Sequence, residues 1–398
     1  LAPGQSRAIK LAGTPADGSR DLTAPRSAAN RERAELMKFG LISIPMTLDY
    51  AAGKQSVRDI IDWDLAVLRW ADQYGLAEAY FAEHYTLGHE PSPAPDLMIA
   101  AASQVTENIR LGALAHLLPY HNPVALGFRL MWLDHMTGGR YNAGFAPGAY
   151  PSDAQLFDTG KNNSEMLAEG MDIIEAIWTR PGPYRIEGKY WTMDMPAYSE
   201  AIHGPHLKPL QEPHPPILMT GMQANSPTLT LAGARGYHPV SQQVNAEVLR
   251  THWDTYSAAA QAAGHVPNRG DWRIARDVFV ADSDDQAREL ALDGPLGRLW
   301  TEYLLPTFIK LGLGALIAGD RVAESDLTVE WMVDNYFFIG SPGTVADKAA
   351  ALYEETGGFG TLFSTIHNYS DNPEPYRRNL ELVGTVVAPR LAGLTPSE

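Results

Sequence analysis

Residues 117–153 read LLPYHNPVALGFRLMWLDHMTGGRYNAGFAPGAYPSD, and this stretch decides the fold. It predicts the end of one strand, a helix over residues 123–139 that closes at Gly138 and Gly139, a second strand over residues 140–148, and a loop rich in Gly and Pro. A helix between two consecutive strands is typical of a parallel pair. The stretch therefore predicts βα units that end in a loop shaped for a ligand.

The same alternation of strands and helices continues on both sides. We expect about eight strands, over residues 37–46, 77–84, 109–119, 140–148, 215–221, 236–241, 272–281 and 359–365. This rhythm predicts an α/β fold, a (β/α)8 TIM barrel with insertions. A doubly wound open sheet is the alternative, although no GxGxxG motif follows the first strand.

The chain divides into two parts by composition. Residues 1–36 hold few large apolar side chains, and we interpret them as a disordered or loosely docked N-terminal extension. Residues 37–398 are predicted to form a single barrel domain. Residues 181–214 and 311–342 fit the rhythm poorly and are expected to be excursions, the first of them over the top of the barrel, where both would build a substrate pocket.

Charge and composition exclude several classes of protein. The net charge of −16 argues against a nucleic-acid partner, because phosphate binding needs a basic surface. The chain has no cysteine, so disulfides, thiolate zinc sites and cysteine nucleophiles are absent. There is no apolar run long enough to span a membrane, and we expect a cytoplasmic protein.

In a barrel of this kind the chemistry lies at the carboxyl ends of the strands. His84 follows the second predicted strand, and Tyr120 and His121 follow the third. A histidine can exchange protons near neutral pH, so these three side chains are the candidate catalytic residues, with His84 first. As alternatives, His84 would be a structural residue tied to Glu83 or to the backbone, and His121 would simply pin the turn after Pro119. The spacing of the histidines matches no metal motif, and we expect no metal.

Two later segments suit a cofactor. In the loop after the fourth strand, Ala146, Gly148, Ala149 and Tyr150 leave little side-chain bulk near the backbone, which would let a flat ring approach. The fifth strand is followed by a helix start that favours phosphate. The candidates there are Gln223, Asn225, Ser226 and Thr228. Plain packing of the loop and plain capping of the helix are the alternatives.

Several of these blocks resemble the bacterial luciferase-like flavin monooxygenases, and within them the limonene monooxygenase-type branch. The blocks are FAEHY (81–85), LLPYHNP (117–123), LDHMTGGR (133–140) and GFAPGAYPSD (144–153), with GTLFSTIHN in the C-terminal half. The resemblance implies a homodimeric barrel that receives reduced FMN from a separate flavin reductase. It also implies that O2 adds at flavin C4a and that the resulting (hydro)peroxyflavin oxygenates a small, largely apolar substrate, such as a terpenoid, cyclic ketone or polyketide-like compound.

The resemblance also assigns residues. His84 matches the histidine that family members carry after strand two. Leu114 and Ala115 occupy the place where many members have a non-prolyl cis peptide beneath the flavin. Ala146 stands where bacterial luciferase has a reactive cysteine, and Pro147 where it has a phosphate-contacting arginine. These departures argue against light emission.

With Pro147 in place of the arginine, other groups must hold the flavin phosphate. We expect the hydroxyls of Ser226 and Thr228 and the backbone of Ala149 and Tyr150 to do so. Two further functions are compatible with the same barrel. One is a deazaflavin-dependent oxidoreductase, whose acidic cofactor would need a basic rim. The other is a non-catalytic flavin-binding protein.

Overall fold

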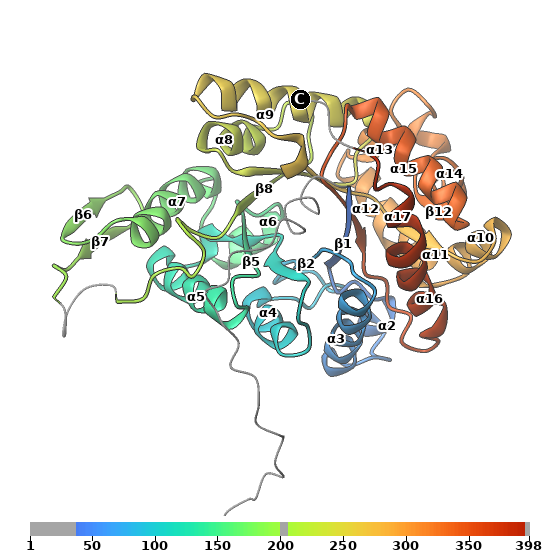
Figure 1. The fold of residues 1–398 in the computed structure, drawn as a ribbon, viewed down its shortest axis with the longest axis horizontal. Helices are drawn as coiled ribbons and strands as arrows, with labels where there is room; N and C mark the ends of the chain where they lie inside the picture. The colour runs from blue at the N-terminus through green and yellow to red at the C-terminus, as the bar shows by residue number, and fades with distance from the viewer. Residues whose placement is uncertain (1–36, 200–205, 395–398) are drawn as a thin grey trace, which may run out of the picture. The chain divides into compact units, whose positions relative to one another are not determined.

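Eight parallel strands close into a barrel in the computed structural model, which describes residues 37–199 and 206–394 (Figure 1). The first strand, β1, pairs with β2 on one side and with the last barrel strand, β13, on the other, so the described sheet closes on itself. The barrel strands are β1 (Lys38–Ser43), β2 (Glu78–Phe81), β3 (Arg110–Ala113), β5 (Tyr141–Ala146), β8 (Ile217–Gly221), β9 (His238–Ser241), β10 (Arg273–Ala275) and β13 (Thr361–Thr365). The predicted (β/α)8 barrel is confirmed and the open sheet is excluded.

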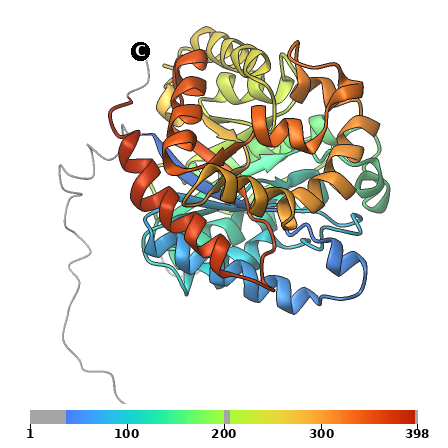
Figure 2. The same ribbon diagram turned by 90° about the vertical axis from the view of Figure 1, so that its right-hand side faces the viewer.

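Helices surround these strands in both perpendicular views (Figure 1 and Figure 2). They are α2 (Leu48–Ala51), α3 (Val57–Gln73), α4 (Pro95–Ser103), α5 (Pro123–Met136), α6 (Pro151–Leu156), α7 (Asn163–Thr179), α8 (Pro227–Arg235), α9 (Ala246–Ala262), α10 (Asp284–Leu292), α11 (Pro295–Leu299), α12 (Leu305–Lys310), α13 (Gly314–Ala318), α14 (Val329–Asn335), α15 (Pro342–Thr356), α16 (Glu374–Leu382) and α17 (Ala388–Arg390). None of the described helices is both long and apolar enough to cross a membrane. The predicted extension over residues 1–36 lies outside the described residues.

The long helices begin where the sequence supplies a cap. Ser56 and Asp59 form a reciprocal capping box at the start of α3. Asn122 accepts hydrogen bonds from two backbone N–H groups of α5, whose first residue is Pro123. Because the caps fix where each helix starts, they also fix which face turns toward the strands.

The end of the barrel where the strands begin is filled by a buried polar network. Arg273 of β10 donates two hydrogen bonds of 2.8 Å to the Glu78 carboxylate of β2. Tyr80 also donates to Glu78 and accepts from the Asn142 amide, whose oxygen accepts from Arg110. Burial would raise the pKa of Glu78, but the charge and hydrogen bonds of Arg273 lower it to about 2. The network therefore joins β2, β3, β5 and β10 through ionised side chains.

The strand predicted over residues 272–281 is wrong in one respect, because the chain leaves the barrel in its middle. Its second half is β11 (Val278–Val280), which pairs outside the barrel with β12 (Phe338–Gly340). The bend lies at Arg276, whose guanidinium stacks on the Tyr336 ring and donates to two backbone carbonyls. These contacts hold the two short strands apart from the sheet.

The first excursion lies elsewhere than predicted. It contains a hairpin, β6 (Tyr184–Glu187) and β7 (Thr192–Met195), which packs on the outer side of the barrel, where Glu169 of α7 accepts from three of its N–H groups. Further on, Gln211 donates to the carbonyl of Tyr141, the first residue of β5. This contact lies at the end of the barrel where the strands begin. Within the described part of residues 181–214, the chain therefore follows the outside of the barrel, except that Tyr190 and Trp191 at the hairpin turn border a cavity together with Tyr120 and His121. The expectation of a cover over the top of the barrel is wrong.

The second excursion does lie on the side of the strand ends. It contains α13, α14 and β12, and the carbonyl of Leu316 accepts from the backbone N–H of Asn245, just beyond β9. Its part in a substrate pocket stays a prediction.

Candidate active site

Strands β2, β3 and β5 are neighbours, and their carboxyl ends bring three of the predicted segments together. His84 follows β2, and Ala146 ends β5. Between them, the peptide bond from Leu114 to Ala115 is cis, at the position where the resemblance led us to expect it. Beyond it, the short strand β4 (His116–Leu117) also pairs with β5. These segments form one wall of the candidate site.

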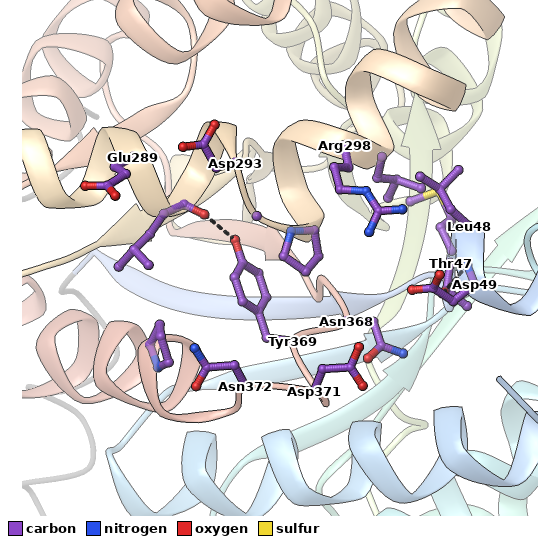
Figure 3. A pocket seen from close by; sticks show the side chains of 16 residues that line it. Thr47, Leu48, Asp49, Glu289, Asp293, Arg298, Asn368, Tyr369, Asp371 and Asn372 are labelled. Atoms are coloured by element: carbon purple, nitrogen blue, oxygen red, sulfur yellow. Dashed lines mark hydrogen bonds between the residues drawn. The ribbon is translucent and has the colours of Figure 1, made fainter. Parts of the chain in front are cut away.

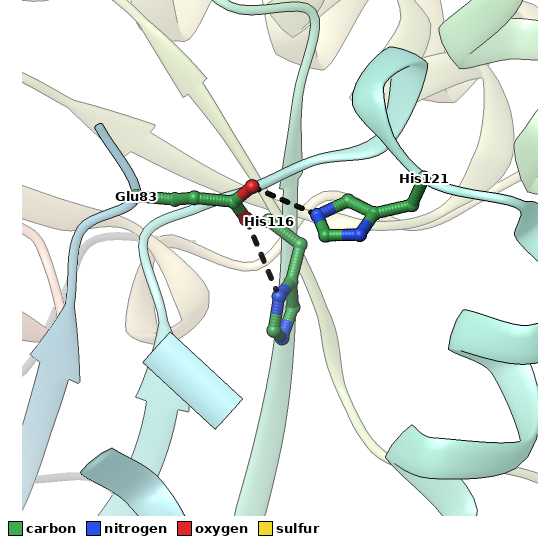
Figure 4. A group of neighbouring side chains, drawn as sticks. All are labelled: Glu83, His116 and His121. Atoms are coloured by element: carbon green, nitrogen blue, oxygen red, sulfur yellow. Dashed lines mark hydrogen bonds and ion pairs between the residues drawn. The ribbon is translucent and has the colours of Figure 1, made fainter. Parts of the chain in front are cut away.

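Glu83 is the hub of this wall (Figure 4). One carboxylate oxygen lies 2.8 Å from Nε2 of His121, and the other lies 3.7 Å from Nδ1 of His116 and accepts from the backbone N–H of Leu117. The hydroxyl of Tyr85 donates to the first oxygen. Burial would raise the pKa of Glu83, but the hydrogen bonds and charges of the two histidines hold it well below its usual range.

The same cluster has the composition of a two-histidine, one-carboxylate metal site. Single ligand atoms of Glu83, His116 and His121 lie within 4.8 Å of one another. The spacing of the histidines in the sequence did not reveal this cluster, because Glu83 precedes them by more than thirty residues. However, the 2.8 Å contact is a hydrogen-bond length, and Leu117 and Tyr85 already occupy the carboxylate. We therefore interpret the cluster as a hydrogen-bonded support.

The predicted catalytic residues His121 and Tyr120 are both engaged in holding the site's walls. His121 contacts Glu83, as described above. The ring of Tyr120 stacks on Phe157 at 4.7 Å, and its hydroxyl accepts from Asn163. A catalytic role for either residue stays a prediction.

His84 differs from these residues, because part of its ring is unpartnered. Its Nε2 lies 3.4 Å from an oxygen of Glu90, whereas its buried Nδ1 has no hydrogen-bond partner among the described residues. The ring meets Tyr150 edge-on, with 5.4 Å between centroids. Burial lowers the pKa of His84 to about 4, so the ring is neutral at pH 7. A neutral imidazole with one free nitrogen can accept or donate a proton.

Sequence reasoning missed Glu90. Its side chain is buried, and it accepts a hydrogen bond of 2.8 Å from the hydroxyl of Tyr303. Burial raises the pKa of Glu90 to about 7, against the lowering effect of Tyr303. The only signal in the sequence was a carboxylate close to His84 in a loop with two prolines, Pro91 and Pro93.

The loop after β5 approaches Tyr120 closely at Gly148. The backbone of Gly148 has a φ of +83°, and a Cβ at this position would lie 2.6 Å from the Tyr120 hydroxyl oxygen. Asn163 donates both to that hydroxyl and to the carbonyl of Pro147, which fixes the loop. The contact with Tyr120 therefore explains why position 148 needs a residue without a side chain, as the sequence predicted. Ala149, next in the chain, is exposed.

At the start of α8, Ser226 occupies the N-cap position, as predicted. Its side chain makes no capping bond, and its hydroxyl lies 3.4 Å from that of Thr228. Asn225 has a φ of +52°, and the carbonyl of Gln223 lies 2.8 Å from Nε2 of His252, so the turn is held in place. Pro227 has no N–H group, and the N–H of Leu229 donates to the carbonyl of Ser226. The N–H of Thr228 and the two hydroxyls are therefore the groups at this helix start that an anion could contact.

A cavity of about 340 Å³ lies beside the segments that follow β1 and β13, away from the wall formed by β2, β3 and β5 (Figure 3). It is bordered by residues 46–49, by α10 and α11, and by the chain after β13, where Tyr369 donates to the carbonyl of Leu290. Its lining is mixed, with Asp293, Arg298 and Asp371 among the charged members and Met46, Leu48 and Leu299 among the apolar members. A second cavity of about 270 Å³ borders Tyr120 and His121.

Comparison with known proteins decides the family. The family model for luciferase-like monooxygenases matches residues 37–359. The chain belongs to this family. It is 37% identical to 3,6-diketocamphane 1,6-monooxygenase of Pseudomonas putida, over 89% of this chain and 98% of that protein. It is 29% identical to limonene 1,2-monooxygenase of Rhodococcus erythropolis, over 84% of this chain and 82% of that protein. The resemblance noted in the sequence is confirmed.

The fold agrees with this assignment. The oxygenating constituent of the P. putida 3,6-diketocamphane monooxygenase, described as a type II Baeyer-Villiger monooxygenase in complex with FMN, superposes with a TM-score of 0.85 at 37% identity. The match covers 91% of this chain and all of that chain. The family's enzymes and this chain therefore share the barrel over nearly its full length.

Proposed function

We propose that this protein is the oxygenase component of a two-component flavin monooxygenase. It takes reduced FMN from a separate flavin reductase and uses O2 to oxygenate a small, largely apolar organic substrate. The similarity over nearly the whole length to a monooxygenase structure that contains FMN carries this proposal. Within the site, the observation that best fits this function is the unpartnered Nδ1 of His84, whose ring contacts Tyr150 in the loop after β5.

The described residues fit FMN part by part. A flat ring needs an apolar surface beneath it, which Leu114 and Ala115 would supply. It also needs a stretch of backbone that it can approach closely, which Gly148 would supply. A phosphate needs N–H groups and hydroxyls, which Ser226 and Thr228 supply at the start of α8. We therefore assign the flavin to the strand ends between β2 and β8.

Reduced FMN, when bound, supplies the electrons that activate O2. The protein's own residues orient the ring, exclude water and hold a proton at His84. Because His84 is half-buried and neutral, it can exchange a hydrogen bond with a reacting oxygen without carrying a charge into the site. Glu83 has a different task, since both of its oxygens are already used to hold β4 and His121.

Cyclic ketones of terpenoid size are the first substrates to test. The relatives' names specify a diketocamphane and limonene, both compact and mostly apolar. The Baeyer–Villiger description of the 37% identical structure favours insertion of oxygen beside a ketone. We also propose a homodimer, which sedimentation analysis of the full chain would test.

Stopped-flow absorbance tests the function directly. Protein mixed anaerobically with photoreduced FMN is exposed to O2, and flavin oxidation is followed with and without a bicyclic diketone. We expect oxidation slower than that of free reduced FMN and a product that carries label from 18O2. Oxidation at the free-flavin rate without product would contradict the proposal. Binding of deazaflavin would then favour a deazaflavin oxidoreductase, and tight FMN binding alone a flavin-binding protein.

Replacement of Ser226 by alanine should weaken binding of FMN and leave binding of riboflavin unchanged. The hydroxyl makes no capping bond, so its loss removes the proposed hydrogen bond to the phosphate and only the long, 3.4 Å contact with the Thr228 hydroxyl besides. A hydrogen bond to a charged group is worth about 1.5–3 kcal/mol, so we expect at least a loss of about tenfold in affinity. Flavin fluorescence titrations measure both ligands. Thr230→Ala, one turn further along α8, is the control, and equal losses for both ligands would contradict the assignment.

Replacement of Gly148 by alanine should lower FMN affinity by about tenfold, because the new Cβ forces either the loop or Tyr120 to move. Gly160→Ala provides a matched control. Gly160 also has a positive φ, of +60°, but nothing lies within 4 Å of its Cβ position. Both variants carry similar backbone strain. Only the variant at Gly148 should change FMN binding, and equal binding by the two would show that the close contact is irrelevant to the cofactor.

A further inference from the structure

The loop after β2 folds back on itself and brings Glu90 beside His84. The backbone N–H of His84 donates to the carbonyl of Ser92, and the Ser92 hydroxyl donates to the carbonyl of Ala82. The carbonyl of His89 accepts from the N–H of Thr47. Hydrogen bonds therefore fix the loop at Ala82, His84, His89 and Ser92. Because the loop is fixed on both sides of Glu90, its fold places the Glu90 side chain beside His84.

Glu90 lies between two partners with different chemistry. The hydroxyl of Tyr303, from the segment between α11 and α12, donates to one carboxylate oxygen of Glu90 at 2.8 Å. His84 faces the other oxygen at 3.4 Å and can be donor or acceptor there. The ring of His89 stacks on Tyr303 at 4.2 Å and limits its movement. The other ionisable groups that act on this cluster are Asp153, Tyr150 and Glu83.

We propose that Glu90 is a positioning residue that determines which nitrogen of His84 carries the proton. When Glu90 is a carboxylate, Nε2–H of His84 donates to it, and Nδ1 is an acceptor toward the reacting centre. When Glu90 is protonated, its O–H donates to Nε2, and Nδ1–H becomes a donor. One proton added to Glu90 therefore converts Nδ1 from acceptor to donor, and the imidazole stays neutral in both states.

The surroundings of Glu90 and His84 place the change of the His84 tautomer near neutral pH. Burial raises the pKa of Glu90 to about 7, and the charge of Asp153 adds to the rise, while burial lowers that of His84 to about 4. Protons therefore enter at Glu90 before they would charge His84. The role of the switch in oxygenation rests on the proposed function, whereas control of the imidazole tautomer does not.

Nitrogen NMR of the full chain, labelled with 15N-histidine and free of flavin, tests the proposal. The His84 signals are identified by their absence from the His84→Gln spectrum. We expect the wild-type signals to change from one neutral tautomer to the other with a midpoint near pH 7. In Glu90→Gln, which is nearly isosteric and cannot ionise, we expect one tautomer throughout. A single tautomer in the wild type, or an unchanged transition in Glu90→Gln, would overturn the proposal.

A second variant tests the direction. Tyr303→Phe removes a hydrogen bond that stabilises the carboxylate, so the midpoint should move to higher pH. Glu302→Gln is the matched control, because this exposed neighbour only contacts Arg298 at 3.6 Å; its midpoint should equal that of the wild type. An unchanged or lower midpoint in Tyr303→Phe would contradict the claim that the Tyr303 hydrogen bond stabilises the Glu90 carboxylate.

The pH dependence of product yield links the switch to catalysis. If the wild type oxygenates, its yield per reduced FMN should vary with pH around the NMR midpoint, and that variation should vanish in Glu90→Gln. An identical pH profile in both proteins would overturn the catalytic part of the proposal. If the wild type oxygenates nothing, the proposed function fails, and the NMR experiment still decides whether Glu90 controls His84.

Discussion

Replacement of Arg273 by methionine should destabilise the protein by about 3–5 kcal/mol at neutral pH, because it leaves the carboxylate of Glu78 buried and unpaired. Arg273 is only 7% exposed and donates two of the hydrogen bonds to that carboxylate, beside the one from Tyr80. Denaturant unfolding at pH 7 measures the loss. The exposed pair Arg288–Asp334, with a similar distance of 2.9 Å, provides the control, since Arg288→Met should cost at most about 1 kcal/mol.

The pH dependence of the Arg273 effect has a definite sign. In the wild type the pKa of Glu78 is lowered to about 2, so its stabilising contribution is present above the unfolded pKa and is lost as the pH falls toward 2. Without Arg273, burial raises the pKa of Glu78, and the variant should recover part of its deficit on acidification. The double variant Glu78→Gln/Arg273→Met should be more stable than Arg273→Met alone. A constant deficit from pH 7 to pH 4 would contradict this account.

The sequence predicted those parts of the fold that depend on local pattern. Gly138 and Gly139 both adopt positive φ where the helix was predicted to close. Ser226 occupies the N-cap of α8, where small hydroxyl residues were expected. Each of these features is determined by a few neighbouring residues, so a single sequence contains enough information to place it.

Features that depend on distant contacts escaped prediction. Within residues 272–281 the charged pair Arg276–Asp277 lies at the bend, but the sequence does not show that it ends the barrel strand. Only the stacking of Arg276 on Tyr336 reveals why the chain turns out of the barrel there. Similarly, Glu90 looked like an ordinary loop carboxylate because its partner Tyr303 lies 213 residues away in the chain. A buried carboxylate owes its properties to its surroundings, and residue spacing does not contain them.

Replacement of His84 by alanine should leave the fold intact and uncouple flavin oxidation from oxygenation. Product formed per reduced FMN should fall, and hydrogen peroxide should rise by the same amount. Loss of a positioned acid–base group typically costs about 10²-fold or more in rate. Both yields are measured in one reaction, with circular dichroism as the test of folding. His135→Ala is the control, because His135 is exposed and binds the carbonyl of Lys208, away from the strand ends.

Comparison of His84→Ala with Glu90→Gln separates direct action from positioning. If Glu90 acts only through His84, the double variant should be no less coupled than His84→Ala alone, because the second change removes a partner that no longer has a ring to hold. Additive losses would mean that Glu90 acts on the reaction by another route. Unchanged coupling in His84→Ala would exclude His84 from the chemistry and leave the unpartnered Nδ1 as a feature of packing.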